Sequence, residues 1–464
     1  MKMAWTWVLA GVLLAGPVHG ASEDADLDRV PPPVEAPPPA GAATAKDVNY
    51  MGNDFAFFGQ RKNLPVPFPP PDSASWRNWL FLDMRDEWRA SPSWRLSYSG
   101  RLNFIVSNNI PAVSRGNVRH DLRELFAEWH PVESIWIDVG RINFRNGVAL
   151  GFNPTDFFRA GSVVDRLTAD PSVLREDRLG TAMLSGQFLF SAGSVTLAYA
   201  PRVSPPRAIG NGPDNPGFDP GFNSTNAEDR FLAKTTLNIS GVFNPEFLFS
   251  KVGNRVQAGA NVTAPMGRGS VLYLEWAGGM RSGLIAEAFR FGRATGALPA
   301  SAAALLPAGS GRRFMHDVSA GLSHATSGGL TVNLEYHFHE AGLSAQDWSN
   351  WYGGAARAGA VPGVAAALWY PRAYALDRQE PVARHEAFVR AEWRDAFTKD
   401  LTLTALTTVD LRDGSGFAQV SAVYRISREW TAGGQFSATF GGRQSDYGSL
   451  PGALTGLARL ARYF

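Results

Sequence analysis

The chain has 464 residues, and 44 Lys and Arg face 42 Asp and Glu, so its formal net charge is only +2. This balance argues against a nucleic-acid-binding protein, which needs a strong basic field, and the lack of cysteine excludes disulfides and cysteine-ligated metals. Past residue 21, no apolar run reaches the roughly 18 residues of a membrane-spanning helix.

The first segment, 1–21, has the features of a secretory signal peptide. Lys2 precedes an apolar stretch, Trp5–Ala15, and small residues follow up to Ala21. Such a segment directs the chain across the inner membrane and is then removed. The next segment, 22–75, is rich in proline, and we interpret it as an extended periplasmic arm. In the simplest interpretation, this arm is a spacer across part of the periplasm. In the alternative, it plugs the barrel or docks a partner.

From residue 76 to 464, the chain repeats segments of about ten residues in which apolar and polar side chains alternate, followed by turns. A period of two is that of a strand whose faces meet different environments. One apolar and one charged face are typical of a transmembrane β-barrel around a water-filled lumen. We count such segments at 77–89, 94–105, 118–130, 134–143, 179–190, 193–200, 230–240, 245–251, 255–264, 269–279, 313–324, 330–340, 384–395, 401–411, 417–426, 430–440 and 456–464.

The connections between these segments alternate between short turns and long loops. Bacterial outer-membrane barrels have an even number of strands, with both termini and the short turns on the periplasmic side. The seventeen segments obey this rule if one more strand precedes them, and Tyr50–Phe58 is the candidate. We therefore predict an all-β fold, an antiparallel transmembrane barrel of about 18 strands (16 is the alternative). Its long loops, Phe144–Arg178 and Gly342–Val382 among them, should be extracellular.

The most distinctive local pattern joins Gly140–Gly147 to the later motif Asn153–Asp156. Asn-Pro favours a turn, and Asp156 suits the start of a short helical stretch, Phe157–Ala160. This pattern resembles the strand-plus-loop signature of the alginate-export-like and related porin-like families of Gram-negative outer-membrane barrels. Some relatives carry tryptophan where this chain has Asn146. The resemblance implies an eighteen-stranded pore whose loop folds inward and narrows it, without specifying a solute.

Charged residues of this loop and of the segment 384–395 are the candidates for lining the pore. Opposed arginine and acidic side chains in a narrow passage select solutes by charge, whereas the alternative is a solvated surface loop with weak ion pairs. We expect Arg141 and Arg145 to reach the pore, with Asp156 holding one of them, and to give a mild anion preference. The candidates are Arg141, Arg145, Asp156, Arg159, Asp165, Arg166, Arg175, Arg178, Arg384, Glu386, Arg390 and Glu392.

The terminal residue, Phe464, closes an alternating segment, although Arg462 interrupts its apolar face. A terminal aromatic residue in this position resembles the assembly signal of bacterial outer-membrane barrels. His337 and His339 share one strand face, but no third metal ligand can be assigned beside them. Because no catalytic motif is present either, we predict no enzyme activity, no metal and no cofactor.

Together these features predict a channel in the Gram-negative outer membrane through which a hydrophilic solute passes passively. The more specific prediction is that this solute is anionic. One alternative is a dedicated export pore for a polysaccharide or other solute, with a periplasmic partner docked on the proline-rich arm. The other is a non-conducting surface receptor or scaffold barrel. The expected partners are outer-membrane lipid, lipopolysaccharide and the barrel assembly machinery, and nucleic acid is not expected.

Overall fold

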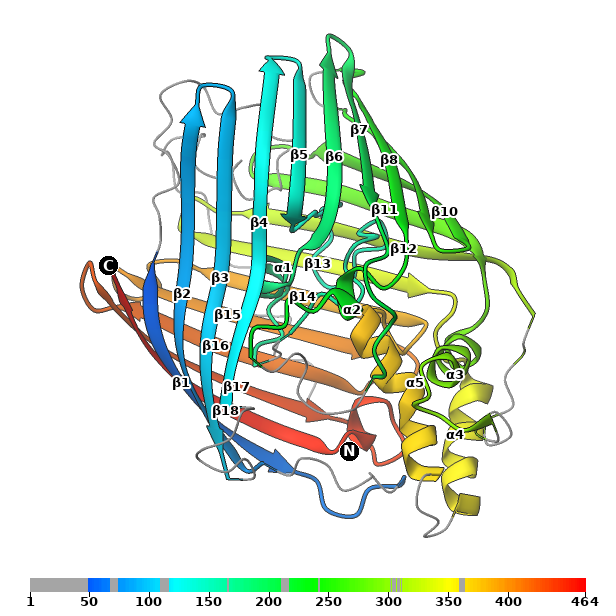
Figure 1. Ribbon diagram of the computed structural model, residues 1–464. Helices are drawn as coiled ribbons and strands as arrows, with labels where there is room; N and C mark the ends of the chain where they lie inside the picture. Colours follow the sequence, from blue (N-terminus) through cyan, green and yellow to red (C-terminus); the bar gives the residue numbers. More distant parts are fainter. Residues whose placement is uncertain are drawn as a thin grey trace.

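The computed structural model describes residues 49–66, 74–108, 117–164, 167–209, 217–240, 243–300, 302, 306, 309, 311–358 and 364–464. Over these residues, eighteen antiparallel strands pair in sequence order, and β1 pairs with both β2 and β18, so the sheet closes on itself (Figure 1). The predicted all-β barrel of 18 strands is confirmed. The predicted signal peptide and most of the proline-rich arm lie outside the described residues.

The strands follow the predicted segments closely, and β1 supplies the additional strand that the alternation of turns and loops requires. Only the last strand differs clearly, because it begins at Gly452 rather than at Gly456. The strands are β1 (Tyr50–Gln60), β2 (Trp76–Ser91), β3 (Trp94–Ser107), β4 (Val118–Val132), β5 (Ile135–Ile142), β6 (Thr181–Phe190), β7 (Gly193–Ala200), β8 (Arg230–Leu237), β9 (Glu246–Val252), β10 (Arg255–Pro265), β11 (Ser270–Arg281), β12 (Arg313–Ala325), β13 (Leu330–His339), β14 (His385–Trp393), β15 (Leu401–Asp410), β16 (Gly416–Arg425), β17 (Trp430–Phe440) and β18 (Gly452–Tyr463).

The two faces of the strands have opposite chemistry. Leu184 and Leu197 on β6 and β7 are about half exposed on the outside, as expected for a barrel that turns an apolar band to lipid. On the inside, Asp83 of β2 lies in register with Arg101 of β3, and both are buried or nearly so. A shift of one residue would turn such charges toward lipid, at roughly 2–4 kcal/mol for each arginine at the midplane, so the alternation fixes the register.

The two ends of the barrel differ. Short hairpin turns connect the strands at one end, which we call the turn end, and both Asn49 and Phe464 lie there, joined by a 3.0 Å bond from the Phe464 N–H to the Asn49 carbonyl. The long connections leave the opposite end, which we call the loop end. Among the described residues, no helix is long and apolar enough to cross a membrane.

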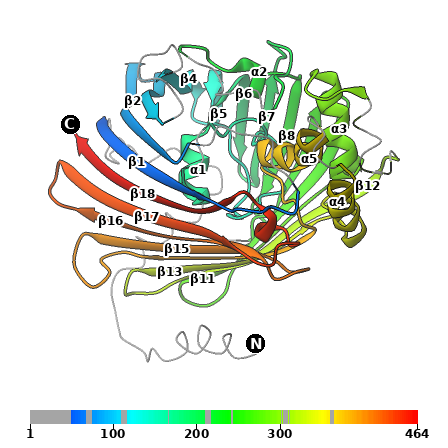
Figure 2. The ribbon, with the colours of Figure 1, turned by 90° about the horizontal axis from the view of Figure 1, so that it is seen from below.

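The long connections contain helices, which the alternation of apolar and polar residues does not predict. Helices α3, α4 and α5 pack together beside the loop end (Figures 1 and 2) around a buried cluster that includes Trp348, Trp351 and Leu368. The indole N–H of Trp351 donates to the Leu368 carbonyl at 2.7 Å and ties α4 to α5. The helices are α1 (Pro171–Asp177), α2 (Phe222–Thr225), α3 (Leu284–Ala294), α4 (Ala345–Ala358), α5 (Val364–Arg378) and the 3₁₀ helix η4 (Tyr447–Ser449).

Candidate pore constriction

The connection between β5 and β6, described at residues 143–164 and 167–180, lies inside the barrel, and we call it the constriction segment. Seen from the loop end, its helix α1 is enclosed by the ring of strands (Figure 2). The segment starts on the β5 side and reaches side chains of β11, β13, β14, β16 and β17. It therefore crosses the lumen and is held by the wall on its far side.

The tip of this segment is held by two wall carboxylates, Glu275 on β11 and Glu335 on β13, which we call the carboxylate latch. Glu275 Oε1 accepts from the N–H groups of Val148 and, at 2.7 Å, Ala149. Glu335 accepts from the N–H groups of Leu150 at 2.7 Å and Gly151 at 2.8 Å. Four consecutive N–H groups thus end on the carboxyl oxygens of two wall side chains.

Each carboxylate of the latch makes further bonds, and those of Glu335 come from the wall. The Tyr273 hydroxyl donates to Glu335 Oε1 at 2.5 Å, and His337 Nε2 lies 2.7 Å from Glu335 Oε2. On the other carboxylate, Thr155 Oγ1 donates to Glu275 Oε2 at 3.2 Å. Both carboxylates are buried with the segment in place; the wall orients Glu335, whereas the further bond to Glu275 comes from the segment itself.

Two glycines allow the segment to approach the latch this closely. Gly147 has φ of +71°, a conformation that residues with side chains rarely adopt. A Cβ atom at Gly151 would lie 2.5 Å from His337 Cε1 and 2.7 Å from Phe388 Cγ. The amide of Asn153 closes the turn by donating to the Asn146 carbonyl at 2.6 Å. The Gly and Asn-Pro pattern of the sequence therefore builds the tip of the segment.

A second anchor holds the part of the segment that immediately precedes α1. Arg390 on β14 contacts both oxygens of Asp170, at 3.1 and 2.9 Å, in a buried two-bond pair, and its Nη2 also lies 2.7 Å from Glu392. Asp170 at the same time caps α1 by accepting from the Ser172 N–H at 3.1 Å. Gln419 on β16 donates to Thr168 at 3.0 Å and accepts from the Ala169 N–H at 2.8 Å.

The end of α1 is fixed on the near wall by a cluster of ion pairs. Asp177 contacts Arg123 at 2.6 Å and Arg101 at 3.2 Å, and both arginines also contact Asp83. Arg85, with 42% of its side chain exposed, lies 3.9 Å from both carboxylates. The segment is thus tied to β2, β3 and β4 at one end and to β11, β13 and β14 at the other.

Two expectations about this segment are wrong in detail. Asp156 holds neither Arg141 nor Arg145; it pairs with Arg178 at 2.6 Å, because Arg178 lies beside it where the segment returns toward β6. Phe157–Ala160 forms turns rather than a helix. The helix lies instead at Pro171–Asp177, where Asp170 caps it and proline occupies the first turn, an arrangement that favours helix initiation.

Three arginines, Arg141 of β5 and Arg145 and Arg175 of the segment, have different surroundings. Arg141 is buried, donates to the Pro220 carbonyl and lies over the Phe222 ring. Arg175 donates to the Asn146 and Gly147 carbonyls at 3.1 and 3.0 Å. Arg145 is exposed. Among the described residues, none of these three arginines forms an ion pair with a carboxylate.

Arg159 connects the segment with the helices at the loop end. It lies 3.8 Å from Glu380, which follows α5, and over the ring of Phe152. Glu380 also contacts Arg281 at 2.9 Å. Although burial raises the pKa of the Glu380 carboxyl, Arg281, with smaller contributions from His339 and Arg159, holds it below its usual range. The Glu380 carboxylate is therefore ionised at neutral pH, and through Arg159 it joins the segment to the residues that follow α5.

The other predicted residues lie nearer the rims or elsewhere on the wall. Arg384 donates to the Gly342 carbonyl at 2.9 Å just before β14. Glu386 accepts from the Tyr447 hydroxyl at 3.4 Å, close to η4. His339 contacts Asp317 at 2.8 Å rather than sharing a ligand with His337. Asp165 and Arg166 lie outside the described residues.

The sequence pattern does not identify all of the residues that hold the segment. Glu275, Glu335, Asp83 and Arg123 are not among the pore candidates named from the sequence. Their signal in the sequence is weak, because each is one of many polar residues on an inward-facing position. Only the path of the segment across the lumen, from Asp83 and Arg123 on the near wall to Glu275 and Glu335 on the far wall, distinguishes them.

Among solved structures, the chain is similar to OccAB1 of Acinetobacter baumannii, with 9% identity, a TM-score of 0.50, and coverage of 90% of this chain and 95% of that chain. It is also similar to Pseudomonas aeruginosa OpdL, at 11% identity and a TM-score of 0.49, over 91% of this chain and 99% of that one. No protein-family model and no curated protein matches the chain. At these identities, the likeness to OccAB1 shows a shared fold.

Proposed function

We propose that the protein is a channel of the Gram-negative outer membrane that lets a hydrophilic solute pass without energy input. The observation that carries this proposal is the constriction segment, which crosses the lumen and is bonded to the wall on both sides. A barrel of this strand number has room for an aqueous path unless it is filled, and an inward segment fixed by the wall narrows that path. In this arrangement the loop end is extracellular and the turn end is periplasmic.

We further propose that the constriction favours anions. Arg141, Arg145 and Arg175 carry charge that no carboxylate in the described residues neutralises by contact, whereas Asp156, Asp170 and Asp177 are each paired with arginine. Positive charge in a partly desolvated passage attracts anions more strongly than it would in bulk water. Of the three arginines, Arg145 is the most exposed and is the residue we expect to influence selectivity most.

An export pore is a variant of the same channel, supported by the resemblance of the Gly140–Gly147 and Asn153–Asp156 pattern to alginate-export-like barrels. In that variant the proline-rich arm would dock a periplasmic partner. A non-conducting barrel is supported by a different observation, the apolar cluster of α3, α4 and α5 beside the loop end. Such a cluster is compatible with a barrel that is closed at the loop end, with a surface that binds a partner, or with a rigid entrance to an open channel.

The partners we propose follow from the surface and from the last strand. Lipid and lipopolysaccharide would cover the apolar outer face, on which Phe247 and Val420 are about half exposed. The barrel assembly machinery would recognise Phe464, which is 69% exposed next to the closing pair of β18 and β1. Replacing Phe464 with alanine should lower the amount of folded barrel in the outer membrane without changing conductance per molecule.

A liposome-swelling experiment tests the proposed function. Vesicles that contain the purified, folded barrel should swell in an iso-osmotic solution of a small sugar, and more slowly as the sugar becomes larger. Small organic anions should enter faster than cations of the same size. Vesicles that do not swell with any solute, although the barrel is folded, would contradict the channel and favour the non-conducting alternative.

A further inference from the structure

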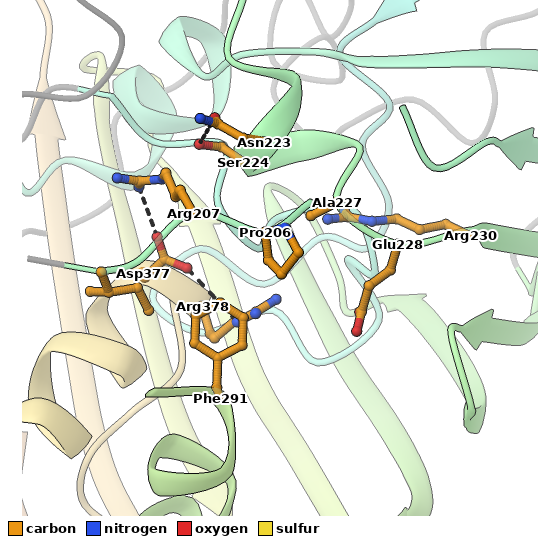
Figure 3. Close-up of a pocket in the computed structure, with 11 residues that line it drawn as sticks. Pro206, Arg207, Asn223, Ser224, Ala227, Glu228, Arg230, Phe291, Asp377 and Arg378 are labelled. Carbon is orange, nitrogen blue, oxygen red and sulfur yellow. Dashed lines mark hydrogen bonds and ion pairs between the residues drawn. The ribbon is translucent and has the colours of Figure 1, made fainter. Parts of the chain in front are cut away.

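A small pocket lies at the loop end, where the start of β8 meets the end of α5 and the β7–β8 connection (Figure 3). Its cavity volume is about 20 Å³, room for one small group, and the pocket is partly open to solvent. The guanidinium groups of Arg230 and Arg378 are directed toward this space from opposite sides (Figure 3). The pocket is separate from the latch and from the Asp170–Arg390 anchor. The other residues that line it include Pro206, Arg207, Asn223, Glu228, Phe291 and Asp377.

Arg230 is the unusual member of this group. Only 4% of the residue is exposed, and its Nε and Nη1 atoms have no hydrogen-bond partner among the described residues. Its nearest aromatic contact is the Phe158 ring, 5.9 Å from the guanidinium carbon, which covers a face of the group but accepts no hydrogen bond in the plane. A buried charged donor without an acceptor is costly, so this position calls for an acceptor from outside the chain.

Arg378 faces the same space with one nitrogen unsatisfied. Its Nε atom has no hydrogen-bond partner and lies 3.8 Å from Asp377 Oδ2. The guanidinium is held flat over the rings of Phe291 and Tyr374, at 4.8 and 5.2 Å. Asp377 Oδ1 is engaged by Arg207 at 3.0 Å, and Asp377 Oδ2 lies too far from Arg378 Nε, at 3.8 Å, to accept a hydrogen bond from it.

The charges around the pocket do not cancel. Among the residues that line the pocket, Arg207, Arg230 and Arg378 supply three positive charges, and Asp377 and Glu228 supply two negative charges, which leaves one positive charge in excess. Glu228 is occupied by Arg255 at 3.0 Å. The two guanidiniums that lack a full set of acceptors are therefore those that point into the pocket.

We propose that this pocket binds a single small anionic group, either the carboxylate of a solute or an inorganic anion, between Arg230 and Arg378. Planar guanidinium groups bind carboxylates and similar oxyanions through paired hydrogen bonds. The small size of the space admits an anionic group rather than a whole large ligand. Binding of a solute carboxylate rests on the proposed channel function, in which this pocket would be a binding site at the loop end that the solute meets before the constriction. Binding of an inorganic anion does not rest on the channel function.

Chloride binding to the full-length, detergent-solubilised barrel tests this proposal. The line width of the chlorine nuclear magnetic resonance is measured while sodium chloride replaces a bulky organic sulfonate at constant ionic strength, and sodium acetate or sodium phosphate is then added as a competitor. Arg230→Gln and Arg378→Gln remove the two arginines separately. Lys234→Gln is the matched control, because it removes one positive charge from the inner face of the same strand, where Lys234 lies 3.6 Å from Glu246.

The wild type and the control should show saturable broadening that a competitor reverses, and both arginine variants should bind chloride at least tenfold more weakly. Stronger competition by acetate identifies a carboxylate site, and stronger competition by phosphate identifies an inorganic-anion site. Folded Arg230→Gln protein that binds like the wild type would overturn the proposal, as would the absence of saturable binding in the wild type. Since no conduction is involved, failure of the channel function would leave this result unchanged, and the reverse also holds.

Discussion

The carboxylate latch makes the sharpest prediction, because two side chains hold the tip of the constriction segment. The double variant Glu275→Ala with Glu335→Ala removes the acceptors of four consecutive N–H groups, those of residues 148–151. In a hydrated lumen, water replaces part of each lost bond, so the net loss is about 0.5–1.5 kcal/mol per bond, or roughly 2–6 kcal/mol in total.

A loss of that size changes the population of the released segment strongly. Each 1.4 kcal/mol is about a tenfold change in equilibrium, so a loss near the middle of the range increases the released fraction by several hundredfold. The segment would remain attached at its second anchor, where Arg390 binds Asp170. We therefore expect a wider and more variable passage rather than an empty barrel.

Single-channel recording in a planar bilayer measures this change. The double variant should have a larger mean conductance and greater open-channel noise than the wild type, and Glu335→Gln, which keeps one acceptor oxygen, should lie between them. Glu246→Ala is the matched control, because this wall carboxylate bonds to Asn261 and Thr236 of neighbouring strands. If the folded double variant has wild-type conductance and noise, the latch does not hold the narrowing element and the reasoning is wrong.

Three further predictions follow from the charges. Arg145→Glu should move the reversal potential under a potassium chloride gradient toward cation preference, and an unchanged potential would place selectivity elsewhere. Removing one partner of the buried Asp170–Arg390 pair should cost about 3–5 kcal/mol and lower the temperature at which the barrel changes gel mobility, whereas the charge-swapped double variant should recover part of that loss. Burial raises the pKa of the Asp446 carboxyl to about 6, although Arg372 contacts it. Because this pKa lies above the unfolded value, the contribution of Asp446 to stability is fully present below about pH 4, and up to about 3 kcal/mol is lost as pH rises through 6. Asp446→Asn should flatten that dependence in a thermal melt followed by tryptophan fluorescence, and an equally steep melt would contradict the assignment.

The barrel could be predicted from the sequence because its signal is local and repeated. Each strand carries its own alternation, and the alternation of short and long connections required one more strand before residue 77, which is β1. Single exceptions did not obscure the pattern. Arg462 interrupts the apolar face of β18, but it lies at the turn end, where it contacts Glu429 at 3.5 Å and stacks on Trp430.

The interior of the lumen could not be predicted in the same way. Asp156 and Arg145 are close in sequence, yet Asp156 pairs with Arg178, because the path of the segment decides which charges meet. The latch joins residues 126 or more positions apart, such as Ala149 and Glu275, and no local pattern records such a contact. Helices α3, α4 and α5 were missed for another reason: their apolar residues pack on one another beside the barrel and not on its wall.

The most direct test of the channel is the current through single molecules of the purified protein in a planar bilayer. Folded wild-type barrel should insert in discrete steps of equal conductance, with steady ohmic current at low voltage and a reversal potential on the anion side in a salt gradient. Folded protein that inserts, as shown by its heat-dependent gel mobility after recovery from the membrane, but carries no current would contradict the central claim.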